Sequence, residues 1–382
     1  MRSTGTRVRL FPFVPPGPAD INGRVVSHKL AALGHWSDDV QSHLFSFVDL
    51  QVSTRDGALE STSLDTLGTW QHAGAVTDIC LADLGGPGSE VLVATASSRG
   101  GICLARLSLP RVPGTSPEDV QIVDLASEDQ RFTPWAVPHG AVSVVSVDVQ
   151  PESKLILSAS SDGGLCFLNP ASSGEPAPEW LRKGGGLGYQ PLAAARWADS
   201  ALAVAADATG CLQLWDARRA PGTPAGTAAV ASSPKGWGCS GAAAGLPPAC
   251  RPHAQWLDVH ASRPNLCCVG SGGGGVAVWD LRMTTKPISV RVGGGEVWEA
   301  RFDADEATCG RAASAVPPVL YCSEGGGLGL ASSDGHAGLA PSGLLLSAPS
   351  GVTSFDVEAG GQDIVATTDS QALVYVRRAR GV

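Results

Sequence analysis

The 382-residue sequence contains no apolar run that approaches the roughly 18 residues needed to cross a bilayer, and it contains no Cys-x-x-Cys pair. The first absence argues against membrane insertion. The N-terminal apolar run 10–14, which follows Arg2, Arg7 and Arg9, is broken by prolines and makes a poor signal peptide. Since the ten cysteines lie mostly within apolar stretches, we expect buried thiols in a reducing compartment rather than a disulfide framework.

Clustered basic residues are also missing, and the net charge is −9. Because binding to phosphates requires clustered Lys and Arg, this charge argues against direct binding of nucleic acid. Hydrophobic residues make up 43% of the chain, which is enough for a folded core and argues against global disorder.

A repeat of alternating, strand-length apolar runs extends along the whole chain. Its clearest copy runs from His139 to Asn169 and has turns at Pro151 and at Asp162-Gly163. Alternation with a period of two indicates half-buried strands, and Asp-Gly is a strong hairpin signal. We identify seven copies and interpret each as one blade; they cover approximately 24–50, 70–105, 135–170, 191–218, 255–282, 296–331 and 350–378.

Two Trp-Asp endings, Trp215-Asp216 and Trp279-Asp280, are typical of WD repeats, whose blades take about 40 to 45 residues. The predicted fold is therefore all-β, a single seven-bladed WD40 β-propeller over residues 1–382 with long surface loops. The strand that closes the last blade is predicted at Arg24 to Lys29. Flexible inserts are predicted at 106–134, 171–190 and 219–252.

Motifs of catalysis are absent or misplaced. The sequence has no His-Glu-x-x-His, no Gly-x-Ser-x-Gly and no phosphate-binding loop. Residues 270–275 satisfy Gly-x-Gly-x-x-Gly, but an alternating strand follows at 276–279, whereas a dinucleotide site needs a helix. A hairpin turn is the better interpretation, and we expect no catalytic residue and no cofactor.

Two further groups of polar residues suggest sites. Zinc ligands could come from Cys239, Cys250, His253 and His260, but only one pair among them is closely spaced, so no metal site is predicted. His72, His139 and Asp78 suggest a catalytic arrangement. In WD repeats such residues form hydrogen bonds within a blade and brace its turns, and we expect that structural role here.

The C-terminal half resembles one WD-repeat family closely. The resemblance rests on the ordered segments Gln255 to His260, Val278 to Arg282, Glu296 to Phe302, Tyr321 to Glu324 and Val352 to Val357. Together they resemble the 43-kilodalton WD-repeat nucleoporins, which belong to the Y-shaped complex in the outer rings of the nuclear pore. The sixth repeat departs from the family pattern, with Gly325 in place of the usual Asp and Ala331 in place of Trp.

This resemblance implies a non-catalytic scaffold subunit at the nuclear envelope that supports nucleocytoplasmic transport of mRNA and protein. The implied partners are the α-solenoid and propeller nucleoporins of the short arm of the Y, with the chain as a monomeric subunit of a hetero-oligomer. From the residues alone, Trp298 and Glu299 are the first candidates for partner binding, because an exposed Trp near a channel mouth is a typical hot spot. The alternative for Trp298 is packing between the fifth and sixth blades.

Two other functions compete with this one. Arg218 and Arg282 both end a Trp-Asp-x-Arg phrase, which resembles the motif by which WD-repeat substrate receptors dock on cullin ubiquitin ligases. Their structural alternative is a salt bridge to a neighbouring blade or simple solvation. A histone-tail reader would need an acidic or aromatic channel mouth to hold a lysine, and Glu296, Glu299 and scattered Asp residues give that reading little support.

Overall fold

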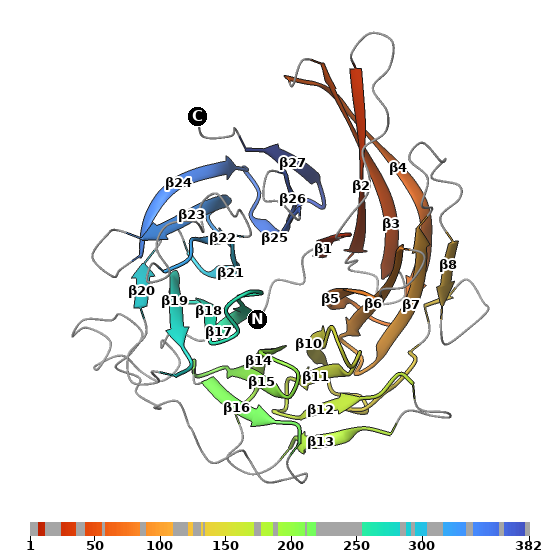
Figure 1. The fold of residues 1–382 in the computed structure, drawn as a ribbon, viewed down its shortest axis with the longest axis vertical. Helices are drawn as coiled ribbons and strands as arrows, with labels where there is room; N and C mark the ends of the chain where they lie inside the picture. Colours follow the sequence, from red (N-terminus) through yellow and green to blue (C-terminus); the bar gives the residue numbers. More distant parts are fainter. Residues whose placement is uncertain are drawn as a thin grey trace.

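The computed structural model describes residues 7–11, 24–35, 43–55, 58–84, 89–109, 121–124, 131–132, 134–171, 177–185, 190–210, 212–218, 254–282, 288–291, 295–303, 316–333, 339–358 and 363–378. All regular elements within these ranges are β-strands (Figure 1). The described part of the chain contains no helix with the length and apolarity to span a membrane.

The strands form small sheets in chain order, which we number accordingly. The first sheet contains β1 (Arg7–Leu10), β2 (Arg24–His35), β3 (Leu44–Arg55), β4 (Ala58–His72) and β9 (Arg131–Phe132). The second contains β5 (Val76–Asp83), β6 (Ser89–Ser97), β7 (Ile102–Leu109) and β8 (Gln121–Asp124). The third contains β10 (Val144–Val149), β11 (Ile156–Ser160), β12 (Leu165–Leu168) and β13 (Glu179–Arg182).

The remaining sheets follow the same plan. The fourth sheet contains β14 (Leu192–Trp197), β15 (Leu202–Asp207) and β16 (Leu212–Asp216), and the fifth contains β17 (Ala254–Val259), β18 (Leu266–Ser271), β19 (Gly275–Asp280) and β20 (Ile288–Arg291). The sixth contains β21 (Val297–Phe302), β22 (Val319–Ser323), β23 (Gly327–Ser333) and β24 (Leu339–Ser347), and the seventh contains β25 (Val352–Val357), β26 (Asp363–Thr368) and β27 (Leu373–Arg377). Paired strands run antiparallel, apart from the short parallel pairing of β4 with β9.

The core lies between the sheets, because the middle strands bury both of their faces. On β6, Val91 and Val93 pack toward the first sheet, while Leu92 and Ala94 pack toward the third. Successive side chains of a strand point to opposite faces, so an unbroken apolar run supplies two interfaces at once. A buried apolar cluster lies between each pair of consecutive sheets, and another joins the seventh sheet to the first.

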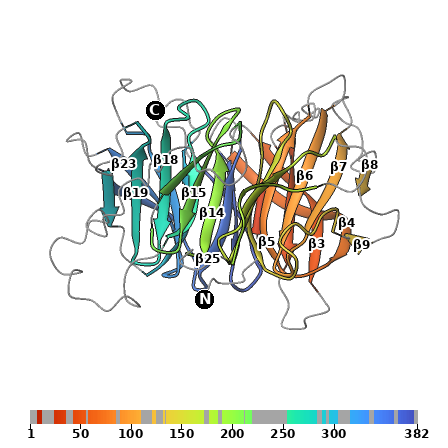
Figure 2. The same cartoon turned by 90° about the horizontal axis from the view of Figure 1, so that it is seen from below.

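The sheets stand around a common centre, with β1, β5, β10, β14, β17, β21 and β25 innermost (Figures 1 and 2). An all-β chain of small antiparallel sheets in this arrangement is compatible with a β-propeller, as the alternation of apolar residues predicts.

The predicted closing strand is wrong. Residues Arg24 to Lys29 belong to β2, which pairs with β1 and β3 rather than with the last sheet. The innermost place in the first sheet is taken by β1, whose apolar residues Val8 and Leu10 pack against Val365 of β26. Polar side chains add to this contact: Lys29 forms ion pairs with Glu358 and Asp363, the latter at 3.2 Å.

Several outer strands lie where inserts or gaps between blades are predicted. β8 and β9 fall within 106–134, β13 falls within 171–190, and β20 and β24 lie outside the predicted blades. Outer strands such as β24 expose much of their surface and therefore lack the apolar alternation that marks inner strands. The insert predicted at 219–252 lies outside the described residues.

Candidate functional site

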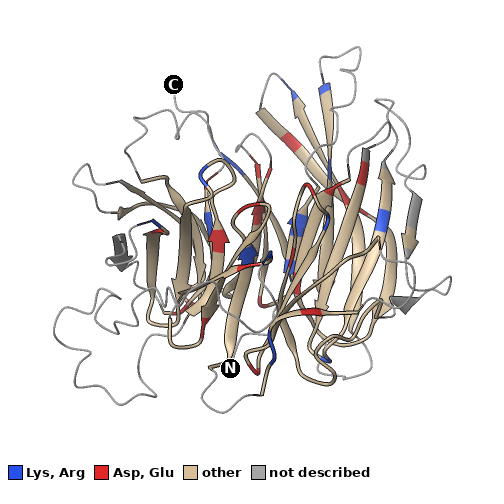
Figure 3. Cartoon of the chain, turned by 60° about the horizontal axis from the view of Figure 1, so that its bottom comes forward, with Lys and Arg blue, Asp and Glu red and all other residues tan. Residues whose placement is uncertain are grey.

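A β-bulge at the same place in six innermost strands aims one side chain at the centre of the molecule. The register between the first two strands shifts before Asp78, Ser146, Ala194, Trp256, Glu299 and Ser354. Because a bulge adds one residue and re-aims the side chains beyond it, the repeated bulge brings these positions together. Figure 3 shows acidic and basic positions side by side on the central strands.

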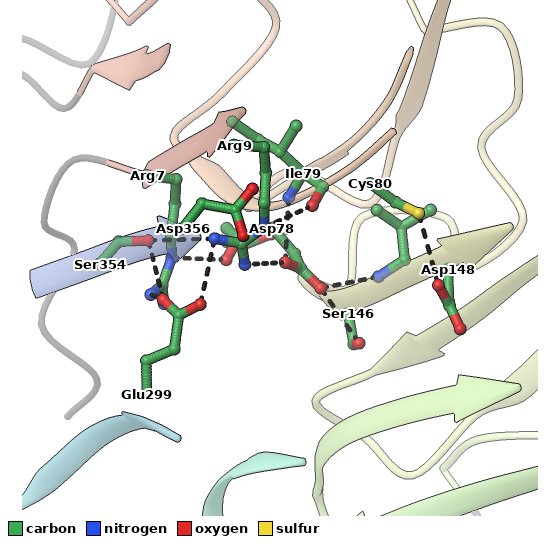
Figure 4. A network of polar contacts seen from close by, with 12 residues as sticks. Arg7, Arg9, Asp78, Ile79, Cys80, Ser146, Asp148, Glu299, Ser354 and Asp356 are labelled. Atoms are coloured by element: carbon green, nitrogen blue, oxygen red, sulfur yellow. Dashed lines mark hydrogen bonds and ion pairs between the residues drawn. The ribbon is translucent and has the colours of Figure 1, made fainter. Parts of the chain in front are cut away.

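Asp78 of β5 lies at one side of this centre and is completely buried. Its carboxylate accepts a hydrogen bond from Arg196 Nη1 at 3.0 Å and pairs with Arg9 Nη2 at 3.4 Å. It also accepts hydrogen bonds from Ser146 Oγ and from the Val147 amide, both at 3.2 Å. Asp78 therefore ties four different sheets together. Figure 4 shows its contacts with Arg9 and Ser146.

Glu299 of β21 has the corresponding role at the opposite side of the centre and is also completely buried. Its oxygens lie 3.1 Å from Arg9 Nη1 and 3.8 Å from Arg7 Nη1, and Arg301 Nε donates to it at 2.6 Å. Ser354 Oγ donates to it at 2.8 Å (Figure 4). The side chain is thus enclosed by three guanidiniums and a hydroxyl, and in this conformation it is not accessible to a partner.

The arginines lower the pKa of both carboxyl groups. Burial alone would raise the pKa of Asp78, but Arg196, Arg9 and Arg7 outweigh it and the pKa is lowered. In the same way, burial opposes ionisation of Glu299, while Arg9, Arg301 and Arg7 lower its pKa below the usual value. Both groups are therefore ionised partners in a buried network, which requires multiple hydrogen bonds to offset their desolvation.

Trp256 of β17 fills the space between the guanidiniums. The ring is 1% exposed, and the guanidinium carbons of Arg196, Arg9, Arg7 and Arg301 lie 4.8, 5.2, 5.4 and 5.7 Å from its centroid. The negative face of an indole attracts such cations, most strongly where water is excluded. This ring therefore reduces the repulsion among four like charges at the centre.

Two residues further along each innermost strand, a second layer crosses the centre. In sheet order it consists of Arg9, Cys80, Asp148, Arg196, Asp258, Arg301 and Asp356. Positive and negative side chains alternate around this layer. Because the layer has an odd number of members, one of them cannot fit the alternation, and the uncharged Cys80 occupies that position. Its Sγ lies 3.4 Å from Asp148 Oδ1 (Figure 4).

The aspartates of this layer also fasten consecutive sheets. Asp148, Asp258 and Asp356 each accept a hydrogen bond from a backbone amide of the next sheet. The donors are Trp197 at 2.8 Å, Phe302 at 3.0 Å and Leu10 at 2.7 Å. The last of these hydrogen bonds joins the seventh sheet to the first, so the same kind of bond is also present where β25 meets β1.

A cavity of about 510 Å³ lies beside the second layer, at the ends of the innermost strands. Its charged lining consists of Arg9, Asp83, Asp148, Arg196, Asp258, Arg301 and Asp356. Burial raises the pKa of Asp148 and of Asp258 above the usual value, although Arg196 and Arg301 respectively act against it. The two carboxylates face the cavity, and the nearby arginines do not fully offset the cost of burying their negative charge.

Of the residues that the sequence suggests for partner binding, Trp298 and Glu299 are neighbours on β21 with different surroundings. Trp298 is the bulged residue, half-buried, and packs on the cluster between the sixth and seventh sheets. A Cβ at Gly351 would lie 2.8 Å from its ring. The alternative prediction, packing between the fifth and sixth blades, names the wrong pair of sheets.

Arg218 and Arg282 lie outside the central network and share one geometry. In each, the backbone amide and the guanidinium bind the aspartate two residues earlier. The Nε–Oδ1 distance is 2.9 Å in both pairs, and the arginine side chains are 77% and 68% exposed. The salt bridge is therefore local and does not reach a neighbouring sheet.

Both histidines form structural hydrogen bonds, as predicted. His72 ends β4, however, and its partner Thr95 lies in β6, so this bond joins the first and second sheets instead of acting within one blade. Asp78 does not act within one blade either. His72 Nε2 lies 3.0 Å from Thr95 Oγ1, and His139 Nε2 lies 2.9 Å from Ser158 Oγ. Burial lowers the pKa of each ring to about 4, so both are neutral at pH 7. Asp78 instead links separate sheets, because its bulge turns it to the centre.

The remaining candidates lie apart from the network. Residues 270–275 form the hairpin turn between β18 and β19, as predicted, with Gly274 at a φ of +78°. No group of three or more His, Cys, Asp or Glu within the described ranges is arranged to hold a metal ion. Of the four zinc candidates only His260 is described, and its Nδ1 accepts a hydrogen bond from the Ser262 amide at 3.2 Å.

Sequence reasoning misses most of the network. The signal that could find it is a charged residue between two apolar ones in six of the seven innermost strands; β5 has Cys80 at this position. The matching triplets are 8–10, 147–149, 195–197, 257–259, 300–302 and 355–357. No protein-family model matches the chain, and the comparison with curated proteins gives no match.

Proposed function

We propose that the chain is a single seven-bladed WD40 β-propeller that serves as a non-catalytic scaffold subunit in the outer ring of the nuclear pore. Its partners in this proposal are other nucleoporins of the short arm of the Y complex, and its place is the nuclear envelope. It would support nucleocytoplasmic transport by holding these partners together, without a cofactor and without direct contact to nucleic acid.

One observation carries the scaffold part of the proposal. The centre of the molecule is crossed by ion pairs through which Asp78 and Glu299 join the first, second, fourth and sixth sheets. Buried charges of this kind make a fold rigid and specific and leave their reactive atoms occupied by hydrogen bonds. A rigid body that presents edges and loops to other proteins fits this arrangement.

The nucleoporin part rests on the resemblance and on where its segments lie. Gln255 to His260 include all of β17 except Ala254, and Glu296 to Phe302 contain β21, so the most specific segments are innermost strands of adjacent sheets. They contribute Trp256, Asp258, Glu299 and Arg301 to the network. The resemblance therefore concerns the framework that fixes the shape of the propeller.

The test is affinity purification of the tagged protein from its own cells in moderate salt, followed by mass spectrometry. Near-stoichiometric recovery of the α-solenoid outer-ring nucleoporins is the expected result. Recovery of a cullin adaptor without nucleoporins would overturn the proposal and favour a ligase substrate receptor. That second function is supported by the exposure and the shared geometry of Arg218 and Arg282.

A further inference from the structure

The cavity at the centre is large enough for a ligand and combines apolar walls with charged groups. Its volume of about 510 Å³ lies within the roughly 300 to 1,000 Å³ of typical ligand pockets. Leu10, Ala82, Val149 and Val259 are apolar residues of the lining and come from four sheets. Such walls suit the aliphatic part of a ligand, and the charged groups of the lining determine the charge of the head group that can bind.

The guanidiniums of the lining are already engaged. Arg9 pairs with Asp78 and Glu299, and Arg196 pairs with Asp78. Arg301 pairs with Glu299 and with Asp356, the latter at 3.1 Å. Since Asp78 and Glu299 are not part of the lining, the network behind the cavity neutralises the arginines and turns their charge away from a ligand.

Two carboxylates of the lining are not neutralised in this way. Within the described residues, neither Asp148 nor Asp258 has a Lys, Arg or His nitrogen within the 4.0 Å of an ion pair. Each carboxylate accepts a hydrogen bond from a backbone amide. The preceding member of the second layer is the thiol of Cys80 for Asp148, whereas it is an arginine for Asp258 and for Asp356. The raised pKa of both groups has the same cause, burial, which outweighs the opposing effect of Arg196 on Asp148 and of Arg301 and Arg196 on Asp258.

The charge of the whole lining points the same way. Apart from Asp83, the lining and the network behind it contain the five carboxylates of Asp78, Asp148, Asp258, Glu299 and Asp356 against the four guanidiniums of Arg7, Arg9, Arg196 and Arg301, so the surroundings of the cavity are net negative. An anionic ligand would lie against unpaired carboxylates, whereas a cation would supply the charge that Asp148 and Asp258 lack.

We propose that this cavity accepts a lysine or arginine side chain from a partner protein, with the cationic head bound by Asp148 and Asp258. The aliphatic stem of such a residue packs on the apolar wall while its head reaches the carboxylates, a division that both side chains make readily. This proposal adds a binding site to the proposed function and rests on that function in one respect, that the ligand belongs to a partner protein. It gives that partner a concrete feature, a basic residue in an exposed segment.

The test uses purified full-length protein and capped five-residue peptides of glycine and serine with a central lysine, arginine or norleucine. Binding is followed by isothermal titration and by the shift in melting temperature. Asp148→Asn and Asp258→Asn keep an oxygen for the Trp197 and Phe302 amides and remove only the charge. Glu179→Gln, an exposed site on β13, is the matched control for lost charge.

We expect the basic peptides to bind the wild type and Glu179→Gln, and the norleucine peptide to bind neither. Each Asp→Asn variant should bind at least about tenfold more weakly, since a hydrogen bond to a charged group typically contributes that factor or more. Equal binding by the Asp→Asn variants, binding of the norleucine peptide, or no binding of the basic peptides would overturn the proposal. Equal or tighter binding of 1,5-diaminopentane would make a free diamine the ligand and overturn its protein origin.

These outcomes are independent of the affinity purification. A protein that binds the basic peptides but recovers no nucleoporin retains the cavity proposal and loses the nuclear pore. A protein that recovers nucleoporins but binds no basic peptide retains the scaffold and loses the cavity as its docking point.

Discussion

Arg9 of β1 and Glu299 of β21 form an ion pair with an Nη1–Oε1 distance of 3.1 Å, and both side chains are more than 90% buried. The contact joins the first strand of the chain to the sixth sheet through the centre of the molecule (Figure 4). Arg9 reaches Asp78 of the second sheet with its other terminal nitrogen. The N-terminal strand thereby becomes part of the framework around which the other sheets pack.

Removal of the Glu299 carboxylate should destabilise the protein strongly. Glu299→Ala removes one of the two carboxylates with which each of Arg9 and Arg301 pairs, and breaking a buried ion pair from one side typically costs about 3 to 5 kcal/mol of unfolding free energy. Urea denaturation followed by tryptophan fluorescence measures this loss. The control Glu179→Ala changes an exposed carboxylate and should alter stability by less than about 0.5 kcal/mol. Similar values for both variants would show that the network contributes little.

Removal of the Asp148 or Asp258 charge should act in the opposite direction. Burial raises the pKa of both groups above the usual value of 3.8, so their ionised forms destabilise the folded state. Their contribution to stability is full below pH 3.8 and is lost as the pH rises through the raised pKa. Asp148→Asn and Asp258→Asn should therefore have higher urea midpoints than the wild type at pH 7. A lower midpoint at pH 7 would mean that the carboxylates stabilise the fold.

The two buried histidines predict a loss of stability in mild acid. Burial lowers the pKa of His72 and His139 from 6.5 to about 4. The unfolded chain therefore binds more protons between these values, and stability is full above pH 6.5 and falls toward pH 4. At about 1.36 kcal/mol per pKa unit, each ring should cost about 2 kcal/mol between pH 7 and pH 5.

The matching variants are His72→Gln and His139→Gln. Each should be less stable at pH 7, since it loses the hydrogen bond to Thr95 or Ser158, but its stability should change less with pH. Urea denaturation at both pH values gives the comparison. If stability falls as much between pH 7 and pH 5 in both variants as in the wild type, the acid sensitivity belongs to other groups.

The architecture could be predicted from the sequence because the innermost and middle strands bury alternating apolar residues. Phe45 and Phe47 on β3, for example, are almost inaccessible and follow the alternation. An outer strand such as β24 could not be predicted in this way, since much of it faces solvent and needs no apolar pattern. The place of β1 was also missed, because the carboxylate partners of Arg7 and Arg9 lie far along the chain.

The site itself depends on contacts that no local pattern encodes. Glu299 follows Trp298 in the sequence, but a bulge separates their surroundings, so that Glu299 faces the centre and Trp298 the seventh sheet. The exposed arginines are the opposite case. For Arg218 and Arg282 the partner lies two residues away, and the short phrase itself contains the interaction.

Replacement of these arginines should therefore separate docking from folding. Exposed ion pairs contribute about 0 to 1 kcal/mol, so Arg218→Ala and Arg282→Ala should change the urea midpoint little. In the scaffold we propose, the double variant should recover nucleoporins as the wild type does. A selective loss of a cullin adaptor by a stable double variant would support the competing ligase function.

Trp298 offers the sharpest test of whether the opposite end of the innermost strands is a partner surface. Its indole packs on the seventh sheet, and Gly351 leaves room for it, since a Cβ there would lie 2.8 Å from the ring. Trp298→Ala should lower the unfolding free energy by about 2 kcal/mol, less than for a fully buried ring because Trp298 is half-buried. Gly351→Ala keeps the indole but displaces it. If Trp298 anchors a nucleoporin, both variants should lose that partner at a temperature where circular dichroism shows them folded. If it serves packing alone, each variant should recover the partner in proportion to its folded fraction, and the anchor would have to lie elsewhere.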